Sequence, residues 1–320
     1  MKKLMVFAMA AMVALASCTK TELVENSAPT PISLKAVAGS VTKGAVTSSD
    51  KFDYDLGVFA FYNTTTNDET YFSNAKFQKC TTTVDVTNSD GTITKKATWE
   101  SDPAKYWPIE SSLDFIVYAP HGNASIDGKK LTVTAANNET TQDDYMYGKE
   151  YYAEFDKTDT HVPVELNHAM SLITVNFTGS TNVTVTSAVI TGVYLSGKYT
   201  VDYSSQSIKP VWSEYGDGTD AVIIASDNED ALSSTAMTKE WMVVPVFNSN
   251  IISFTYKMDG MDDNAPGIPC EIDLDLNGEL IAGTHYTYNI DISANEIKFT
   301  TTVEGWNKTS KTENFMPDNN

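Results

Sequence analysis

The side chains best suited to acid–base or metal chemistry are the histidines, which lie far apart in the sequence at His121, His161, His168 and His285. A catalytic triad needs a histidine beside a nucleophile, yet the sequence has no Gly-x-Ser-x-Gly elbow or comparable serine context. His168 shares the apolar face of the alternating run 164–172, which predicts a histidine packed or hydrogen-bonded at a core edge. We therefore predict neither an enzyme nor a metal site.

Acidic residues are abundant and form adjacent pairs at residues 143–144 and 262–263. Glycosidase chemistry requires two carboxylates opposed across a cleft, which a sequence does not show. The string from Asp273 to Gly278 opens like a calcium loop, but its twelfth position is Thr284 instead of a glutamate. Its alternating apolar residues favour a strand with acids facing water. No cofactor is predicted.

Cysteine chemistry is limited to three residues, Cys18, Cys80 and Cys270. None lies in a Cys-x-x-Cys or Cys-x-x-His context, so the sequence predicts neither a zinc site nor a thiol-redox motif. Cys80 and Cys270 are predicted to be buried structural thiols, because free cysteine is among the most buried residue types. A disulfide between them remains an open alternative.

The N-terminus has the pattern of an export signal. Lys2 and Lys3 precede an apolar segment at 4–15, which is shorter than the ~20 residues of a membrane span. Residues 15–18 (LASC) match the lipobox of bacterial lipoproteins, so we predict a signal peptide at 1–17 and acylation, with palmitate, at Cys18. The alternative is a free cysteine in a plain signal peptide. Residues 18–31 are polar and predict a flexible tether.

The formal charge of the 320-residue chain is −20, and all 22 basic residues are lysine. Nucleic-acid binding requires a basic surface that displaces counterions, so a nucleic-acid partner is excluded. The hydrophobic fraction of 41% is large enough for packed cores. The sequence therefore predicts a folded, acidic, exported protein.

Short apolar runs rich in Val, Ile, Thr, Tyr and Phe dominate the rest of the chain and predict β-strands. The clearest lie at 56–62, 113–118, 131–135, 171–177, 183–194, 241–247, 251–256, 285–292 and 297–303. No window keeps a helical period beyond the signal peptide, so we predict an all-β protein. Because single cores stop growing near ~250 to 300 residues, we expect two β-sandwich domains in tandem, at 32–160 and 161–320.

A series of short motifs recurs in a characteristic order along the chain. They are the lipobox at Cys18, VTKG at 41–44, LGVFAFY at 56–62, KYWP at 105–108, LDFIVYAP at 113–120, DYMYG at 144–148, VELNHAMSL at 164–172, MVVP at 242–245, GTHYTYNI at 283–290 and GW at 305–306. Taken together, the chain resembles the fimbrillin family of Bacteroidetes surface proteins, which form the shaft, anchor and tip of type V pili.

The resemblance implies two transthyretin-like β-sandwich domains in tandem and a lipid-anchored precursor at the outer membrane. It also implies that a trypsin-like protease removes the first strand and that a strand from the next subunit fills the opened groove. Such strand addition satisfies exposed backbone groups and apolar pockets together. The implied partners are other fimbrial subunits in a head-to-tail polymer, the outer membrane through the lipid, and a host or bacterial surface ligand.

Mapped onto this chain, the resemblance places the exchangeable first strand at 32–42. One face of that strand carries Ile32, Leu34, Ala36 and Ala38. The processing site maps to Lys43, for which an ordinary exposed loop lysine is the alternative. The best-known maturation proteases of the family are arginine-specific, and this chain has no arginine. A subunit that is never cleaved therefore remains an alternative.

The C-terminal tail is a poor donor strand, because residues 307–320 offer only the adjacent Phe315 and Met316 as large apolar residues. The run 297–303 alternates well and is predicted to be the last core strand. Tyrosines could serve as a sugar-stacking platform or as core, at Tyr145, Tyr147, Tyr151 and Tyr152.

We predict a structural and adhesive subunit of a cell-surface fimbria. The alternatives are a stand-alone surface lipoprotein that binds glycan or host protein through its loops, and an exported β-rich enzyme.

Overall fold

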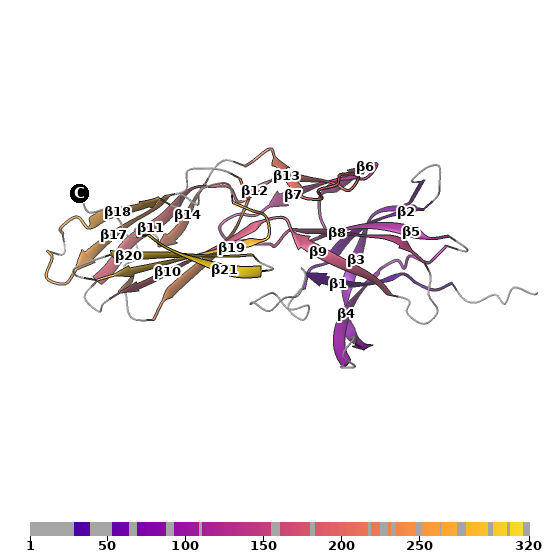
Figure 1. Ribbon diagram of the computed structural model, residues 1–320, viewed down its shortest axis with the longest axis horizontal. Helices are drawn as coiled ribbons and strands as arrows, with labels where there is room; N and C mark the ends of the chain where they lie inside the picture. Colours follow the sequence, from indigo (N-terminus) through magenta and orange to yellow (C-terminus); the bar gives the residue numbers. More distant parts are fainter. Residues whose placement is uncertain are drawn as a thin grey trace, which may run out of the picture.

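Every regular element that the computed structural model describes is a β-strand (Figure 1). The described residues are 29–38, 53–63, 69–87, 93–108, 111–154, 161–179, 183–216, 219–224, 230–231, 235–246, 251–262, 264–273, 280–293, 297–305 and 308–315. Among them no apolar helix reaches membrane-spanning length. The all-β prediction is confirmed.

Seven strands form a closed barrel at one end of the elongated molecule (Figure 1). Around the barrel they are β1 (Ser33–Ala38), β4 (Ile93–Ser101), β3 (Glu69–Thr87), β2 (Leu56–Tyr62), β5 (Leu113–Ala119), β8 (Met146–Ala153) and β9 (His161–His168). Neighbouring strands are antiparallel except β1 and β9, which run parallel and close the ring.

The strands β2 and β5 are buried on both faces. In β2, Leu56 and Val58 belong to the barrel core, whereas Phe59 and Phe61 belong to a second core outside the barrel. A strand covered on both sides has no polar face. This double burial explains why both strands are almost entirely apolar. The exception is the buried Asp114 of β5, whose carboxylate accepts a hydrogen bond from Asn63 Nδ2 at 2.7 Å.

A four-stranded sheet covers that outer face of the barrel. Its order is β13 (Pro210–Ser213), β12 (Ser196–Asp202), β7 (Lys130–Ala136) and β6 (Ala124–Asp127). Two hairpins distant in sequence therefore share one sheet through the β7–β12 pairing. The Tyr199 hydroxyl donates to the Met146 backbone oxygen at 3.2 Å, and Trp212 Nε1 donates to the Ala169 oxygen at 2.9 Å. These bonds fasten the sheet to the barrel.

The C-terminal half packs two sheets around one core. The first has the order β16 (Met237–Val243), β10 (Ser171–Gly179), β19 (Thr284–Ile292), β20 (Ile297–Gly305) and β21 (Lys308–Phe315). The second has the order β14 (Thr219–Ile224), β11 (Val183–Val193), β17 (Ile251–Met258) and β18 (Ile268–Asp273), with β15 (Asp230–Ala231) beside β11. Phe177 of one sheet meets Phe254 of the other edge to face, with ring centroids 5.4 Å apart.

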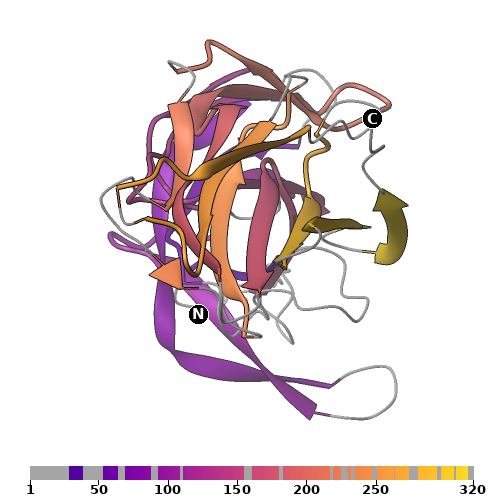
Figure 2. The same cartoon turned by 90° about the vertical axis from the view of Figure 1, so that its left-hand side faces the viewer.

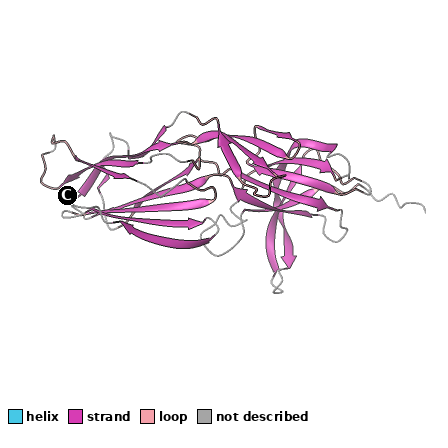
Figure 3. Ribbon diagram, turned by 45° about the horizontal axis from the view of Figure 1, so that its top comes forward, coloured by secondary structure: helices cyan, strands magenta, loops and turns pink. Residues whose placement is uncertain are grey.

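Part of the β3–β4 hairpin extends away from the barrel as a two-stranded arm (Figures 2 and 3). The pairing of β3 with β2 ends at Phe77, and the register with β4 shifts between Lys79 and Thr83. Extra residues in one strand of a pair bend and twist it. The shift lies where the arm leaves the barrel.

The sheets change between β9 and β10, whereas the expected division at residue 160 falls before β9. β9 pairs with β1 and β8 of the barrel, and β12 pairs with β7. The polar stretch before β9 marked a loop, but long-range pairing decided which sheet the strand joined. The two transthyretin-like domains stay a prediction.

Candidate functional site: the first strand and its groove

The first strand completes the barrel between β9 and β4. It pairs with residues 161–166 of β9 at six positions, from Ser33 to Ala38. On its other edge it pairs with β4 at two positions. The backbone N–H of Ile32 extends this contact by donating to the Lys105 oxygen at 2.7 Å. β1 therefore supplies backbone hydrogen-bond partners to both neighbours.

The inward face of β1 is apolar and covered. The exposed fractions of Ile32, Leu34 and Ala36 are 1%, 0% and 2%. They share the barrel core with Val162 and Val164 of β9. The side chain of Ala38 and residues 39–42 of the expected strand lie outside the described part of the chain. Full burial of one Ile or Leu side chain contributes about 1.5–3 kcal/mol to stability. Burial of Ile32 and Leu34 therefore stabilises the packing of this segment against the barrel.

Trp99 of β4 contributes to the groove beneath β1. It is 0% exposed and pairs with Leu34 across the strands. Its Nε1 donates to the Tyr54 backbone oxygen at 2.9 Å, and its own backbone oxygen accepts from Ser33 Oγ at 3.4 Å. The local sequence does not single out this residue, because Trp99 follows a mixed polar stretch and only its pairing with β1 reveals its position.

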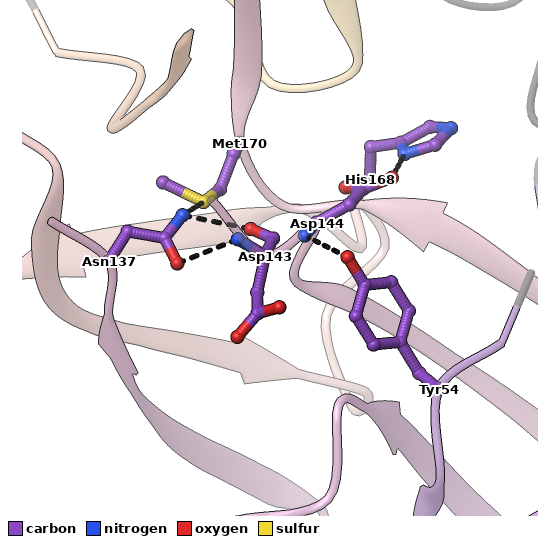
Figure 4. Close-up of polar contacts among 6 residues, drawn as sticks. All are labelled: Tyr54, Asn137, Asp143, Asp144, His168 and Met170. Carbon is purple, nitrogen blue, oxygen red and sulfur yellow. Dashed lines mark hydrogen bonds and ion pairs between the residues drawn. The ribbon is translucent and has the colours of Figure 1, made fainter. Parts of the chain in front are cut away.

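A buried polar cluster lies at the end of β9 (Figure 4). His168 Nδ1 is 2.7 Å from Asp144 Oδ2, and the Asp144 backbone N–H donates to the Tyr54 hydroxyl at 3.0 Å. The exposed fraction of His168 is 3%, which confirms the prediction of a hydrogen-bonded core-edge histidine. Burial raises the pKa of the Tyr54 hydroxyl, so it remains a neutral partner.

A second pair of bonds fixes the loop that enters β8. Asn137 Nδ2 donates to the Asp143 backbone oxygen at 2.8 Å, and Asn137 Oδ1 accepts from the Asp143 N–H at 3.0 Å. Asn137 Nδ2 also contacts Met170 Sδ at 3.4 Å (Figure 4). Burial raises the pKa of the Asp143 carboxyl. This cluster holds together the β8 and β9 ends and therefore supports one wall of the groove.

The remaining histidines lie on separate elements. His161 begins β9, His121 follows β5, and His285 Nε2 on β19 is 2.7 Å from Thr174 Oγ1. Among the described residues, no group of three or more His, Cys, Asp or Glu has the arrangement of a metal site.

The two described cysteines are free thiols, Cys80 on β3 and Cys270 on β18. The expectation of full burial was wrong, because both are half-buried. Cys80 lies where the arm leaves the barrel, and Cys270 lies on a terminal strand of its sheet. Cys18 and Lys43 lie outside the described residues.

The tyrosines considered as a sugar-stacking platform differ in their exposure. Tyr145 and Tyr147 are 7% and 5% exposed and belong to the core between the barrel and the four-stranded sheet. Tyr151 is half-buried against that core, and the side chain of Tyr152 is outside the described set. Tyr145 and Tyr147 therefore belong to the core, and neither can serve as an exposed sugar-stacking platform.

A family model with the description fimbrillin-like matches residues 40–306. The chain belongs to the fimbrillin-like family. A candidate fimbrium subunit of Bacteroides uniformis, Fim1C, is 24% identical over 209 residues, which cover 63% of this chain and 64% of that protein. The match thus spans less than two thirds of the relative's length.

Solved structures of other proteins share the fold of this fimbrillin-like chain. A candidate cell adhesion protein from Bacteroides uniformis superimposes with a TM-score of 0.54 at 19% identity, covering 86% of this chain and 98% of that one. A second, from Bacteroides ovatus, gives 0.54 at 14% identity, covering 91% and 100%. At these identities the likeness establishes the fold.

Proposed function

We propose that this fimbrillin-like chain is a structural and adhesive subunit of a cell-surface fimbria, exported as a lipoprotein precursor and assembled by β-strand exchange. The observation that carries the proposal is the place of β1. It is one short strand, paired on both edges, whose apolar face enters the barrel core. A segment of that kind can be replaced by an equivalent strand from another chain.

Removal of β1 uncovers two kinds of surface together. The β9 edge loses its backbone partners along six positions, and the core loses Ile32, Leu34 and Ala36. An incoming strand restores both if it carries two large apolar residues and then a small one at alternate positions. Repeated head to tail, this exchange yields an open filament instead of a closed ring.

The precursor is anchored by acylated Cys18 to the outer membrane and carries β1 in its own groove. Cleavage at Lys43 disconnects β1 from the rest of the chain, because that residue follows the strand and precedes β2 in sequence. β1 is then held only by noncovalent contacts. A stand-alone, uncleaved surface lipoprotein is the second candidate, and it is favoured by the absence of arginine from the sequence.

The test is limited trypsin digestion of the full mature-length chain, followed by N-terminal mass mapping and sizing in SDS gels. We expect selective cleavage after Lys43, protection of Lys35 by the pairing of β1, and the appearance of SDS-resistant ladders. Lys43→Gln is the matched control and should remain monomeric. A chain that is cut at Lys43, loses β1 and stays monomeric would contradict strand exchange and favour the stand-alone lipoprotein.

A further inference from the structure

The chain enters the barrel at the end that faces away from the C-terminal half. β1, β5 and β9 all begin at this outer end, whereas His168 at the other end of β9 leads directly into β10 of the C-terminal half (Figure 1). The Thr30 backbone oxygen accepts from the Trp107 N–H at 3.0 Å, and Pro31 forms a β-bridge with Tyr106. The segment that precedes β1 is therefore fixed to the loop that follows β4.

Three tyrosines form a connected aromatic cluster at the outer end, Tyr62, Tyr71 and Tyr106. Tyr62 ends β2 and Tyr71 lies near the start of β3, and their rings meet edge to face with centroids 4.9 Å apart. The Tyr71 hydroxyl donates to the Tyr106 backbone oxygen at 2.6 Å. Tyr62 and Tyr71 are partly buried against the barrel core, and 43% of Tyr106 is exposed. The core thus holds a cluster whose outermost residue is open to solvent.

The tyrosine cluster is uncharged and amphipathic. Burial raises the pKa of the Tyr71 hydroxyl, so this group stays protonated at neutral pH. Tyrosine rings, which have an apolar body and a polar tip, are enriched where lipid tails meet water. Glu69, the cross-strand partner of Tyr62, is exposed, and the whole chain carries a formal charge of −20. A lipid surface that accepts this cluster must therefore have neutral headgroups.

The proposed lipid anchor lies a short length of chain away from this end. Ten residues, 19–28, separate Cys18 from Pro29, the first residue that the structure describes. A segment of that length spans at most ~40 Å when fully extended and about 20 Å as a flexible chain. The tether therefore holds the outer end of the barrel close to the bilayer.

We propose that the outer end of the barrel rests on the membrane and that the tyrosine cluster docks among neutral lipid headgroups. The inference rests on the lipid anchor of the proposed function and adds a noncovalent contact to it. A flexible tether alone leaves the orientation of the chain free. Docking at the outer end directs the C-terminal half away from the membrane.

Quenching of tryptophan fluorescence by labelled lipid tests the docking. The mature-length chain is coupled through Cys18 to a maleimide phospholipid in phosphatidylcholine vesicles, in a Cys80→Ser and Cys270→Ser background. One variant carries Tyr106→Trp and the control carries Tyr215→Trp. With brominated phosphatidylcholine we expect several-fold more quenching of the tryptophan introduced by Tyr106→Trp, after subtraction of the native tryptophan signal.

Tyr215 is the matched control because its exposed fraction is also 43% and it lies near the C-terminal half. Its ring is 5.1 Å from the ring of Tyr194, whose backbone oxygen accepts from the Val244 N–H at 2.8 Å. Equal quenching of the two variants would overturn the proposal.

Vesicle partitioning is a second measurement, made on the chain coupled through Cys18 to one myristoyl group, which binds membranes only reversibly. Tyr106→Ala should weaken partitioning into phosphatidylcholine vesicles about five-fold, and Tyr215→Ala should leave it unchanged. Partitioning of Tyr106→Ala equal to that of the unsubstituted chain would also overturn the docking. Both measurements supply the lipid chemically, so a failure of natural acylation, detected by mass spectrometry of the native protein, is a separate result.

Discussion

Truncation of Leu34 measures how firmly the first strand is held in its groove. Leu34 is 0% exposed in the barrel core, and Leu34→Ala removes three carbon atoms. At ~0.8 kcal/mol per buried methylene plus a cavity term, we expect a loss of about 3 kcal/mol in the free energy of unfolding. With a urea m-value of about 2 kcal/mol per molar, the midpoint falls by about 1.5 M.

The assay is urea unfolding of the full chain, followed by tryptophan fluorescence and by circular dichroism. Trp99 is the cross-strand partner of Leu34, so its fluorescence reports on the barrel, alongside the signal of the four other tryptophans. Leu34→Met is the matched control, because a swap that nearly conserves volume costs less than ~1.5 kcal/mol. A midpoint shift below about 0.3 M for Leu34→Ala would show that β1 is not packed as described, and it would remove the main support for a groove.

Three further changes test the packing elsewhere. Gly148→Ala should lower the free energy of unfolding, measured by thermal denaturation, by several kcal/mol, because a Cβ there would lie 2.2 Å from a backbone oxygen of β9. Gly122→Ala is the control and should leave stability unchanged, because a Cβ at that position meets open space. Tyr288→Phe should raise the free energy of unfolding in urea by about 1 kcal/mol, because the buried Tyr288 hydroxyl has no hydrogen-bond partner among the described residues. A lower free energy of unfolding would indicate that the hydroxyl does have a partner. Ser204→Ala should raise the pKa of the Asp202 carboxyl, measured by carbon-13 NMR, because hydrogen bonds from the Ser204 hydroxyl and N–H lower that pKa in the folded protein. The stabilisation from these hydrogen bonds is present above the unfolded-state pKa of Asp202 and is lost as the pH falls through its folded-state pKa. An unchanged pKa in the variant would contradict this assignment.

Local apolar pattern was enough to predict many of the strands. The runs at 56–62 and 251–256 correspond to β2 and β17, and the alternation through His168 correctly placed its side chain at a core edge. Such patterns depend on the two faces of a strand, which the residue order itself specifies. They failed for β3 and β4, where polar and threonine-rich stretches form the arm without a continuous apolar face.

The sequence by itself determined the all-β class, the family and the apolar face of the first strand, because these depend on residue types at fixed spacings. Only the tertiary structure decided that β1 lies between β9 and β4, that Trp99 lies beneath it, and that β12 completes a sheet with β7. Hydrogen bonding between backbones is nearly independent of side-chain identity, so the partner of each edge is set by the packing of distant cores and not by local sequence.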